Sequence, residues 1–213
     1  LGQWALLRDA SLLSSGRLRL TTSTSQYQLG VAWCPLIVST ARLNITFSFQ
    51  VTPPSGAKAA DGIALLLTDS ENGLSAIGGF EGGSMGFVPG PKGKGIPNTY
   101  GVVFNTFENP EFGDISANDV HLTSVTSDGF SRIKGEDVSS LIGSLQSGAI
   151  FTTNVYIVDN VLSVRLNGKG IPSLQNVPLS NVPSQVLLGF SGSTGGLTAV
   201  QDIFNVAATA TNS

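Results

Sequence analysis

Candidate oxygen ligands for a metal ion occur at alternate positions directly after the apolar residues 102–104. Asn105, the backbone carbonyl of Phe107 and Asn109 can all face one point from a single turn. From further along the chain, Asp114 can close on the same point. Hard cations such as Ca²⁺ prefer this mixture of amide, main-chain and carboxylate oxygens, at about 2.3–2.6 Å. The spacing therefore predicts a calcium-organised binding loop rather than a catalytic centre.

Residues that could carry covalent or acid–base catalysis are scarce. The chain has one histidine, His121, and one cysteine, Cys34, and neither lies in a motif typical of a nucleophilic triad. A glycoside hydrolase needs two facing carboxyl groups, about 5–5.5 Å apart if retaining and about 6.5–9.5 Å apart if inverting. Glu108 and Glu111 lie at odd spacing in a proline-containing loop. We therefore expect no enzymatic activity, and we expect Cys34 to be a buried thiol.

Charge and hydropathy exclude several classes of partner. The 213 residues are 41% hydrophobic and 12% charged, with a net charge of -3 and no basic cluster. This balance argues against electrostatic capture of nucleic acid or of an anionic membrane, and no apolar run is long enough to insert into a bilayer. The chain starts at Leu1 without methionine, which is compatible with a processed product. We expect a secreted or extracellular location.

Strand patterns must position these residues. Residues 43–51 alternate between apolar and polar, as expected of a strand with one buried face, and residues 63–67 are apolar on both faces. Asp159-Asn160 separates two strand patterns and suits a two-residue hairpin turn. The one helix candidate covers residues 135–145, a stretch that is equally compatible with a loop. The many short strands predict an all-β antiparallel sandwich in a single domain over residues 1–213.

Four separated segments resemble the legume-type (L-type) lectin family and follow one another in the family's order. They are residues 60–62 (Ala-Asp-Gly), 82–87, 103–114 and 189–197. The third is similar to the family's Glu-Phe-Asp-Thr-Phe-x-Asn loop, and the fourth is similar to its Gly-Phe-Ser-Ala-Ser-Thr-Gly segment. The resemblance implies a concanavalin-like jelly-roll β-sandwich whose sugar site is built by loops around a calcium ion.

The resemblance assigns sugar-binding roles to particular residues. Asp61, preceded by a cis peptide bond from Ala60, would accept hydrogen bonds from two sugar hydroxyls, and Gly82 would donate its backbone N–H. A glycine is useful at such a position because the missing Cβ lets a ligand approach the main chain. Two further roles fall on Phe107, whose ring would stack under the sugar while its carbonyl binds calcium. Asn109 would bind calcium and donate an amide N–H to the sugar.

The loop with Gly196 and Leu197 sits where family members tune which sugar they accept. This loop is compatible with mannose/glucose-type and with galactose-type glycans, and we favour the first. The expected partners are therefore glycans or glycoproteins. Family members also associate through varied sheet faces, so a homo-oligomer is compatible with the resemblance.

The chain departs from the family at the metal residues. The transition metal of plant members is held by Glu, Asp, Asp and His, but Val103 stands at the glutamate position and Asn105 at the first aspartate position. Of this set only Asp114 and His121 remain. We therefore expect no transition metal. His121 is a candidate ligand for a second metal, but we favour a strand residue with a hydrogen-bonded ring. A second carboxylate for calcium could come from Glu108, Glu111 or Asp119.

The leading prediction is thus non-catalytic carbohydrate binding, with Ca²⁺ as the cofactor that organises the loops. The alternative is a structural or adhesive β-sandwich module that has lost sugar binding. Val103 and Asn105 motivate this alternative, because both replace charged ligands of the family pattern.

Overall fold

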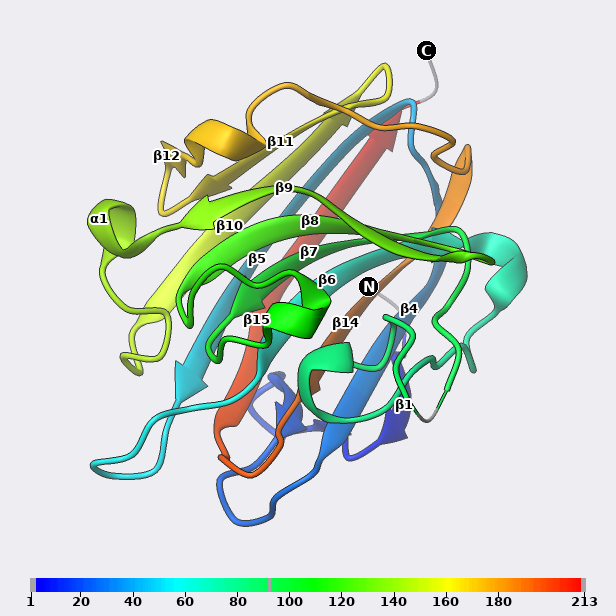
Figure 1. Ribbon diagram of the computed structural model, residues 1–213. Helices are drawn as coiled ribbons and strands as arrows, with labels where there is room; N and C mark the ends of the chain where they lie inside the picture. The colour runs from blue at the N-terminus through cyan, green and yellow to red at the C-terminus, as the bar shows by residue number, and fades with distance from the viewer. Residues whose placement is uncertain (1–2, 92, 212–213) are drawn as a thin grey trace.

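Two antiparallel sheets face one another in the computed structural model, which describes residues 3–91 and 93–211 (Figure 1). Residues 1–2, 92 and 212–213 lie outside the described part, and with them the first residue, on which the expectation of processing rests. The seven-stranded sheet has the order β1 (Ala5–Arg8), β4 (Leu29–Ser39), β14 (Gln185–Ser193), β6 (Gly62–Asp69), β7 (Thr99–Asn105), β8 (Asp119–Thr126), β9 (Gly129–Asp137). The eight-stranded sheet has the order β12 (Lys169–Gly170), β11 (Val161–Leu166), β10 (Ile150–Val158), β5 (Arg42–Thr52), β15 (Val200–Thr211), β3 (Leu18–Thr21), β2 (Ser11–Leu12), with β13 (Val177–Pro178) beside β11. The predicted all-β antiparallel sandwich is confirmed.

Helical structure in the described residues is confined to single turns. The α-helix α1 covers Ser139–Ile142, and 3₁₀ turns cover Ser70–Asn72, Gly82–Ser84, Pro110–Phe112 and Pro172–Leu174. No helix in this part of the chain is long and apolar enough to cross a membrane.

Aromatic rings join the two sheets across the main core. On β5 the alternate residues Leu43, Ile45, Phe47, Phe49 and Val51 are all buried, as the sequence pattern predicted. The ring of Phe47 lies 4.9 Å from that of Phe190 on β14, and the ring of Phe49 lies 4.8 Å from that of Phe104 on β7. Because these distances are centroid separations typical of favourable ring pairs, the rings fix the two sheets against each other.

The central strand β6 is buried on both faces. Its residues Ile63, Leu65 and Leu67 belong to the main core, whereas Ala64 and Leu66 belong to a second cluster on the outer side of the sheet. The second cluster includes Met85, Phe87, Val88 and Ile96, which come from the glycine-rich segment between β6 and β7. This segment therefore covers the outer face of the sheet, and it carries one of the candidate site glycines.

Of the helix candidate over residues 135–145, which is equally compatible with a loop, only one turn is helical. Residues 135–137 continue β9 and pair with β8, with Gly135 opposite His121. Only Ser139–Ile142 form a helical turn, which ends at Gly143 with φ of 78°. The pairing with β8 overrides the weak helical pattern at its start.

Two other local predictions are confirmed. Asp159 and Asn160 form a two-residue hairpin turn, with φ values of 51° and 60°, between the paired residues Val158 and Val161. Cys34 on β4 is buried, with 3% of its surface exposed.

Candidate functional site

Four loops meet at one end of the seven-stranded sheet. The backbone N–H of Asp61, just before β6, donates to the carbonyl of Ser193 at the end of β14 at 2.8 Å. The N–H of Thr106, just after β7, donates to the carbonyl of Asp61 at 2.9 Å. The hydroxyl of Ser193 donates to the carbonyl of Gly82 at 2.6 Å. All four resembling segments are therefore in contact, as expected of one site.

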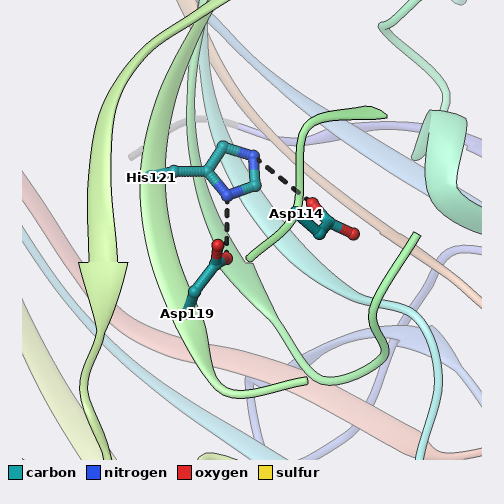
Figure 2. Close-up of side chains that lie close together, drawn as sticks. All are labelled: Asp114, Asp119 and His121. Atoms are coloured by element: carbon teal, nitrogen blue, oxygen red, sulfur yellow. Dashed lines mark hydrogen bonds and ion pairs between the residues drawn. The ribbon is translucent and has the colours of Figure 1, made fainter. Parts of the chain in front are cut away.

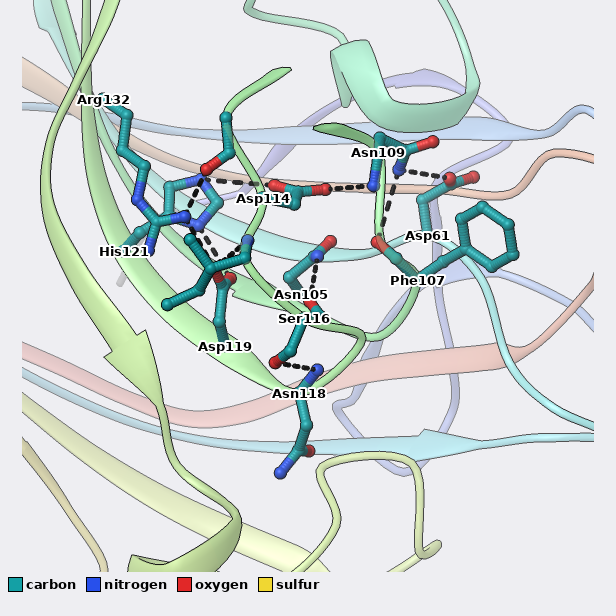
Figure 3. Close-up of polar contacts among 12 residues, drawn as sticks. Asp61, Asn105, Phe107, Asn109, Asp114, Ser116, Asn118, Asp119, His121 and Arg132 are labelled. Carbon is teal, nitrogen blue, oxygen red and sulfur yellow. Dashed lines mark hydrogen bonds and ion pairs between the residues drawn. The ribbon is translucent and has the colours of Figure 1, made fainter. Parts of the chain in front are cut away.

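Asp61 offers a buried hydrogen-bond acceptor. The Ala60–Asp61 peptide bond is cis, and only 3% of Asp61 is exposed. Its Oδ1 accepts from the side-chain amide of Asn109 at 3.1 Å, whereas its Oδ2 has no partner among the described residues (Figure 3). Burial raises the pKa of this carboxyl to about 6. A ligand with hydroxyl donors would satisfy the unpaired oxygen, whose burial is otherwise costly.

Two glycines, Gly82 and Gly83, let their turn lie close to the side chains of Asp61 and Asn109. Gly82 has φ of 74°, and a Cβ there would lie 4.0 Å from Asp61 Oδ2. Its N–H donates to the carbonyl of Thr194 at 3.2 Å, so its role as a donor to a sugar stays a prediction. A Cβ at the neighbouring Gly83 would come within 2.9 Å of the amide nitrogen of Asn109. Both positions therefore keep the turn close to the polar groups of the site.

Asn109 connects Asp61 to the predicted calcium residues. Its side-chain nitrogen also contacts the carbonyl of Phe107 at 3.3 Å, and its backbone N–H donates to Asp114 Oδ2 at 2.8 Å. The ring-bearing residue Phe107 is 38% exposed, whereas Asp114 is only 9% exposed. Burial raises the pKa of Asp114 to about 6. The loop thus presents an exposed aromatic residue beside buried polar groups.

The predicted calcium residues fit a hard cation. Asn105 is fully buried; its amide nitrogen donates to the carbonyl of Ser116 at 3.1 Å, but its Oδ1 has no partner among the described residues. An unpaired buried amide oxygen and a buried carboxylate with a raised pKa are groups that a bound cation would stabilise. Asn105, Asn109, Asp114 and the carbonyl of Phe107 would hold it. Glu108 and Glu111 are exposed on the same loop.

The acidic cluster beside these residues does not fit a transition metal. Ligand atoms of Asp114, Asp119 and His121 lie within 4.8 Å of one another, with the His121 ring between the two carboxylates (Figure 2). However, both oxygens of Asp119 are already engaged, by His121 Nδ1 at 2.9 Å and by Arg132 Nη1 at 2.8 Å. Val103, at the family's glutamate position, is a buried apolar residue. His121 is therefore a strand residue with a hydrogen-bonded ring.

Asp119 is held as a carboxylate by its neighbours. Burial would raise the pKa of this carboxyl, but its hydrogen bond and charge interaction with His121, a backbone N–H from Ile115 and the charge of Arg132 keep the pKa below its usual range. Both oxygens of Asp119 are therefore paired with groups of the chain itself, among them Arg132, which the sequence did not single out. No local motif marks Arg132, since it lies on the next strand.

The predicted specificity loop adjoins a segment that the sequence did not single out. Gly196 is exposed and Leu197 is half-buried. Gln26 donates its side-chain amide to the carbonyl of Gly196 at 2.6 Å, and Tyr27 donates its backbone N–H to the carbonyl of Gly195 at 3.1 Å. Tyr27 is 64% exposed. Because this segment is a polar run without periodicity, the sequence carries no signal for its place beside the site.

Sequence comparison connects the chain to known lectins. Residues 3–207 match the legume lectin domain. The chain is 28% identical to truncated lectin 2 of Medicago truncatula, over 92% of this chain and 74% of that protein. It is 26% identical to the galactose-binding lectin of Arachis hypogaea, over 88% of this chain and 70% of that protein.

Solved structures show the same fold. Peanut lectin with a nine-residue peptide has a TM-score of 0.71 at 23% identity, covering 98% of this chain and 93% of that one. The Lotus tetragonolobus seed lectin has a TM-score of 0.74 at 17% identity, covering 100% and 96%. The VIP36 exoplasmic/lumenal domain in its Ca²⁺-bound form has a TM-score of 0.73 at 17% identity, covering 100% and 85%.

The match to the family and the shared jelly-roll sandwich agree with the four segments that meet at the site. The named relatives are lectins rather than enzymes, in line with the expectation of a non-catalytic protein. The chain belongs to the legume lectin domain family.

Proposed function

We propose that the chain binds glycans without catalysing a reaction on them, through the loops at one end of the seven-stranded sheet. The observation that carries the proposal is the unpaired, buried Oδ2 of Asp61 beside the amide of Asn109 and the exposed residue Phe107. Sugars present adjacent hydroxyls for paired hydrogen bonds and an apolar ring face for aromatic stacking. This combination of acceptor, donor and aromatic residue matches both features.

Each residue has a distinct role in the proposed complex. Asp61 accepts hydrogen bonds from two hydroxyls, and Phe107 stacks under the ring. The backbone N–H of Gly82, which donates to the carbonyl of Thr194 in the structure, would be shared with a sugar hydroxyl. Asn109 has two amide N–H groups, which here contact Asp61 Oδ1 and the carbonyl of Phe107. A cation bound to that carbonyl would leave the second N–H free for a sugar hydroxyl. The cation and the sugar would then favour the same arrangement of the loop.

We further propose that the cation is Ca²⁺, held by Asn105, Asn109, Asp114 and the carbonyl of Phe107. The ligand set is made of oxygens alone, as calcium prefers. Because Asp114 is its only carboxylate, we expect weaker binding than in sites with more charged ligands. The Ca²⁺-bound form of the VIP36 domain, which shares the fold, supports the proposal.

The sugar class rests on the loop with Gly196 and Leu197. We favour mannose/glucose-type glycans from the sequence, and the name of the Arachis relative supports the galactose-type alternative. We also propose that residues 1–213 act as one domain in a secreted or lumenal setting, where glycans and glycoproteins are available. Association of two or more copies is compatible with this role.

A glycan array with calcium and again after chelation tests the proposal. We expect binding with calcium, loss of binding on chelation, and loss of binding in Asp61→Ala. The matched control is Asp128→Ala, since Asp128 is an exposed aspartate in the β8–β9 turn. Thermal unfolding of both variants checks that they are folded.

Each other result has a defined meaning. Binding that survives chelation would remove calcium from the proposal and keep the sugar site. Wild-type binding by a folded Asp61→Ala variant would refute the assignment of Asp61. A wild-type protein that binds no glycan in either condition would favour the structural or adhesive module, which Val103 and Asn105 motivate.

A further inference from the structure

A guanidinium group lies behind the proposed calcium residues. The side chain of Arg132 on β9 is 14% exposed, and its Nη1 donates to Asp119 Oδ2 at 2.8 Å. The same nitrogen donates to the backbone carbonyl of Gly113, the residue before Asp114. Arg132 therefore connects β9 to the loop that carries the site.

Two features of β9, a bulge and a glycine, accommodate the side chain of Arg132. The pairing of β8 with β9 shifts between Leu122 and Thr123, which leaves Ile133 as an extra residue next to Arg132. Bulges of this kind redirect the side chains beside them. Gly135 lies opposite His121, and a Cβ there would overlap both the Arg132 guanidinium and His121. A glycine at 135 thus leaves room for the guanidinium over the histidine.

Polar and charged side chains form one continuous series of contacts from β9 to the site. Arg132 pairs with Asp119, and Asp119 Oδ1 lies 2.9 Å from His121 Nδ1. The other ring nitrogen, His121 Nε2, lies 4.0 Å from Asp114 Oδ1. Asp114 in turn accepts the backbone N–H of Asn109. Of these residues, Asp114 and His121 stand at transition-metal positions of the resembling family.

We infer that Arg132 is a positioning residue that takes the place of a transition metal in this chain. It neutralises the buried carboxylate of Asp119 and ties Gly113 to β9, so that Asp114 and Asn109 are held in place for calcium. The inference rests on the proposed function, in which this loop binds calcium and sugar. As a consequence, Ca²⁺ is the one cation of the site that a chelator can remove, because the second cation is the guanidinium of Arg132.

An arginine suits this role for physical reasons. A guanidinium keeps its charge at all physiological pH values and presents planar N–H donors in fixed directions. It can therefore satisfy a carboxylate and a backbone carbonyl together, as a metal ion would. A metal ion can be removed by a chelator, whereas Arg132 cannot.

The test measures calcium affinity by titration calorimetry in the wild type and in Arg132→Gln, with and without added Zn²⁺. We expect Zn²⁺ to leave the wild-type calcium affinity unchanged. We expect Arg132→Gln to bind calcium roughly tenfold or more weakly, the usual effect of losing a residue that orients ligands. Added Zn²⁺ should restore much of the affinity in this variant, through Asp114, Asp119 and His121.

Matched variants separate positioning from general damage. Arg165→Gln removes an exposed arginine on β11 and should bind calcium as the wild type does. Adding His121→Ala to Arg132→Gln should abolish the rescue by Zn²⁺. Since the chain has a single histidine and a single buried cysteine, few other groups can bind Zn²⁺ tightly. A role of Arg132 in stability alone would show no rescue by Zn²⁺.

Two results would overturn the inference while the proposed function stands: wild-type calcium affinity in Arg132→Gln, or a wild type whose calcium affinity rises on adding Zn²⁺. If Arg132→Gln does not fold, the wild-type titration still tests the inference, because a rise in calcium affinity on adding Zn²⁺ would overturn it. If the wild type binds glycan without calcium, glycan affinity becomes the readout. A wild type that binds neither calcium nor glycan would refute the proposed function, and the role of Arg132 with it.

Discussion

At the scale of single residues, Asp61 combines burial with an unpaired oxygen, and this makes the folded protein sensitive to pH. The pKa of Asp61 is raised by burial from 3.8 to about 6. Because the folded state binds this proton more tightly than the unfolded chain does, the free energy of unfolding falls as pH rises through this range. The shift corresponds to at most about 3 kcal/mol.

We therefore expect the metal-free wild type to lose more stability between about pH 5 and about pH 7.5 than Asp61→Asn does. The amide cannot ionise, so it lacks this contribution, whereas the similar effect of Asp114 is present in both proteins. Urea unfolding in chelator across this range measures the difference. If the free energies of unfolding of the two proteins changed equally with pH, the ionised carboxylate of Asp61 would not be destabilising in the folded state.

The residues of the site differ in how far sequence alone could predict them. Short sequence segments with recognisable spacing contain Asp61, Asn109 and Asp114. In the structure Asn109 contacts both aspartates. Arg132 reaches Asp119 from another strand, 13 residues away, and its direction depends on a bulge. Strand register and bulges are set by packing of whole sheets, so no local pattern could have indicated this contact.

At the scale of elements, the β10–β11 hairpin depends on the backbone conformation of its turn. Asp159 and Asn160 both have positive φ, which asparagine tolerates better than alanine does. We expect Asn160→Ala to lower the free energy of unfolding by about 1 kcal/mol. We expect Asn160→Gly to stay within about 0.5 kcal/mol of the wild type, because glycine adopts positive φ readily. Urea unfolding of the three proteins measures both effects, and equal stability of Asn160→Ala would contradict the argument.

Elements with a strong repeating pattern were predictable, whereas weak patterns were decided by neighbours. The alternation over residues 43–51 predicted β5 and its buried face. The helix candidate over residues 135–145 begins as β9, because pairing of Gly135 with His121 extends the sheet. An isolated helix of this length is marginal in water, so backbone pairing with β8 prevails.

At the scale of the whole molecule, a well-packed sandwich supports a loop end with incomplete hydrogen bonding. The core joins its sheets through aromatic rings, but Asp61 Oδ2 and Asn105 Oδ1 at the loop end lack partners among the described residues. Buried groups of this kind lower stability unless a ligand satisfies them. The stability of the fold should therefore depend on what binds at that end.

Calcium is accordingly expected to raise the melting temperature. A ligand that binds only the folded state at a hundred times its dissociation constant stabilises by about 2.7 kcal/mol. For a chain of this size that gain corresponds to a rise of roughly 5–10 °C. The variant Asp114→Asn should lose most of the rise, because it removes the only charged ligand, yet in chelator it should be at least as stable as the wild type. Asp128→Asn should keep the full rise. Calorimetry of the three proteins with calcium and with chelator measures these shifts, and an equal rise in Asp114→Asn would place the calcium elsewhere.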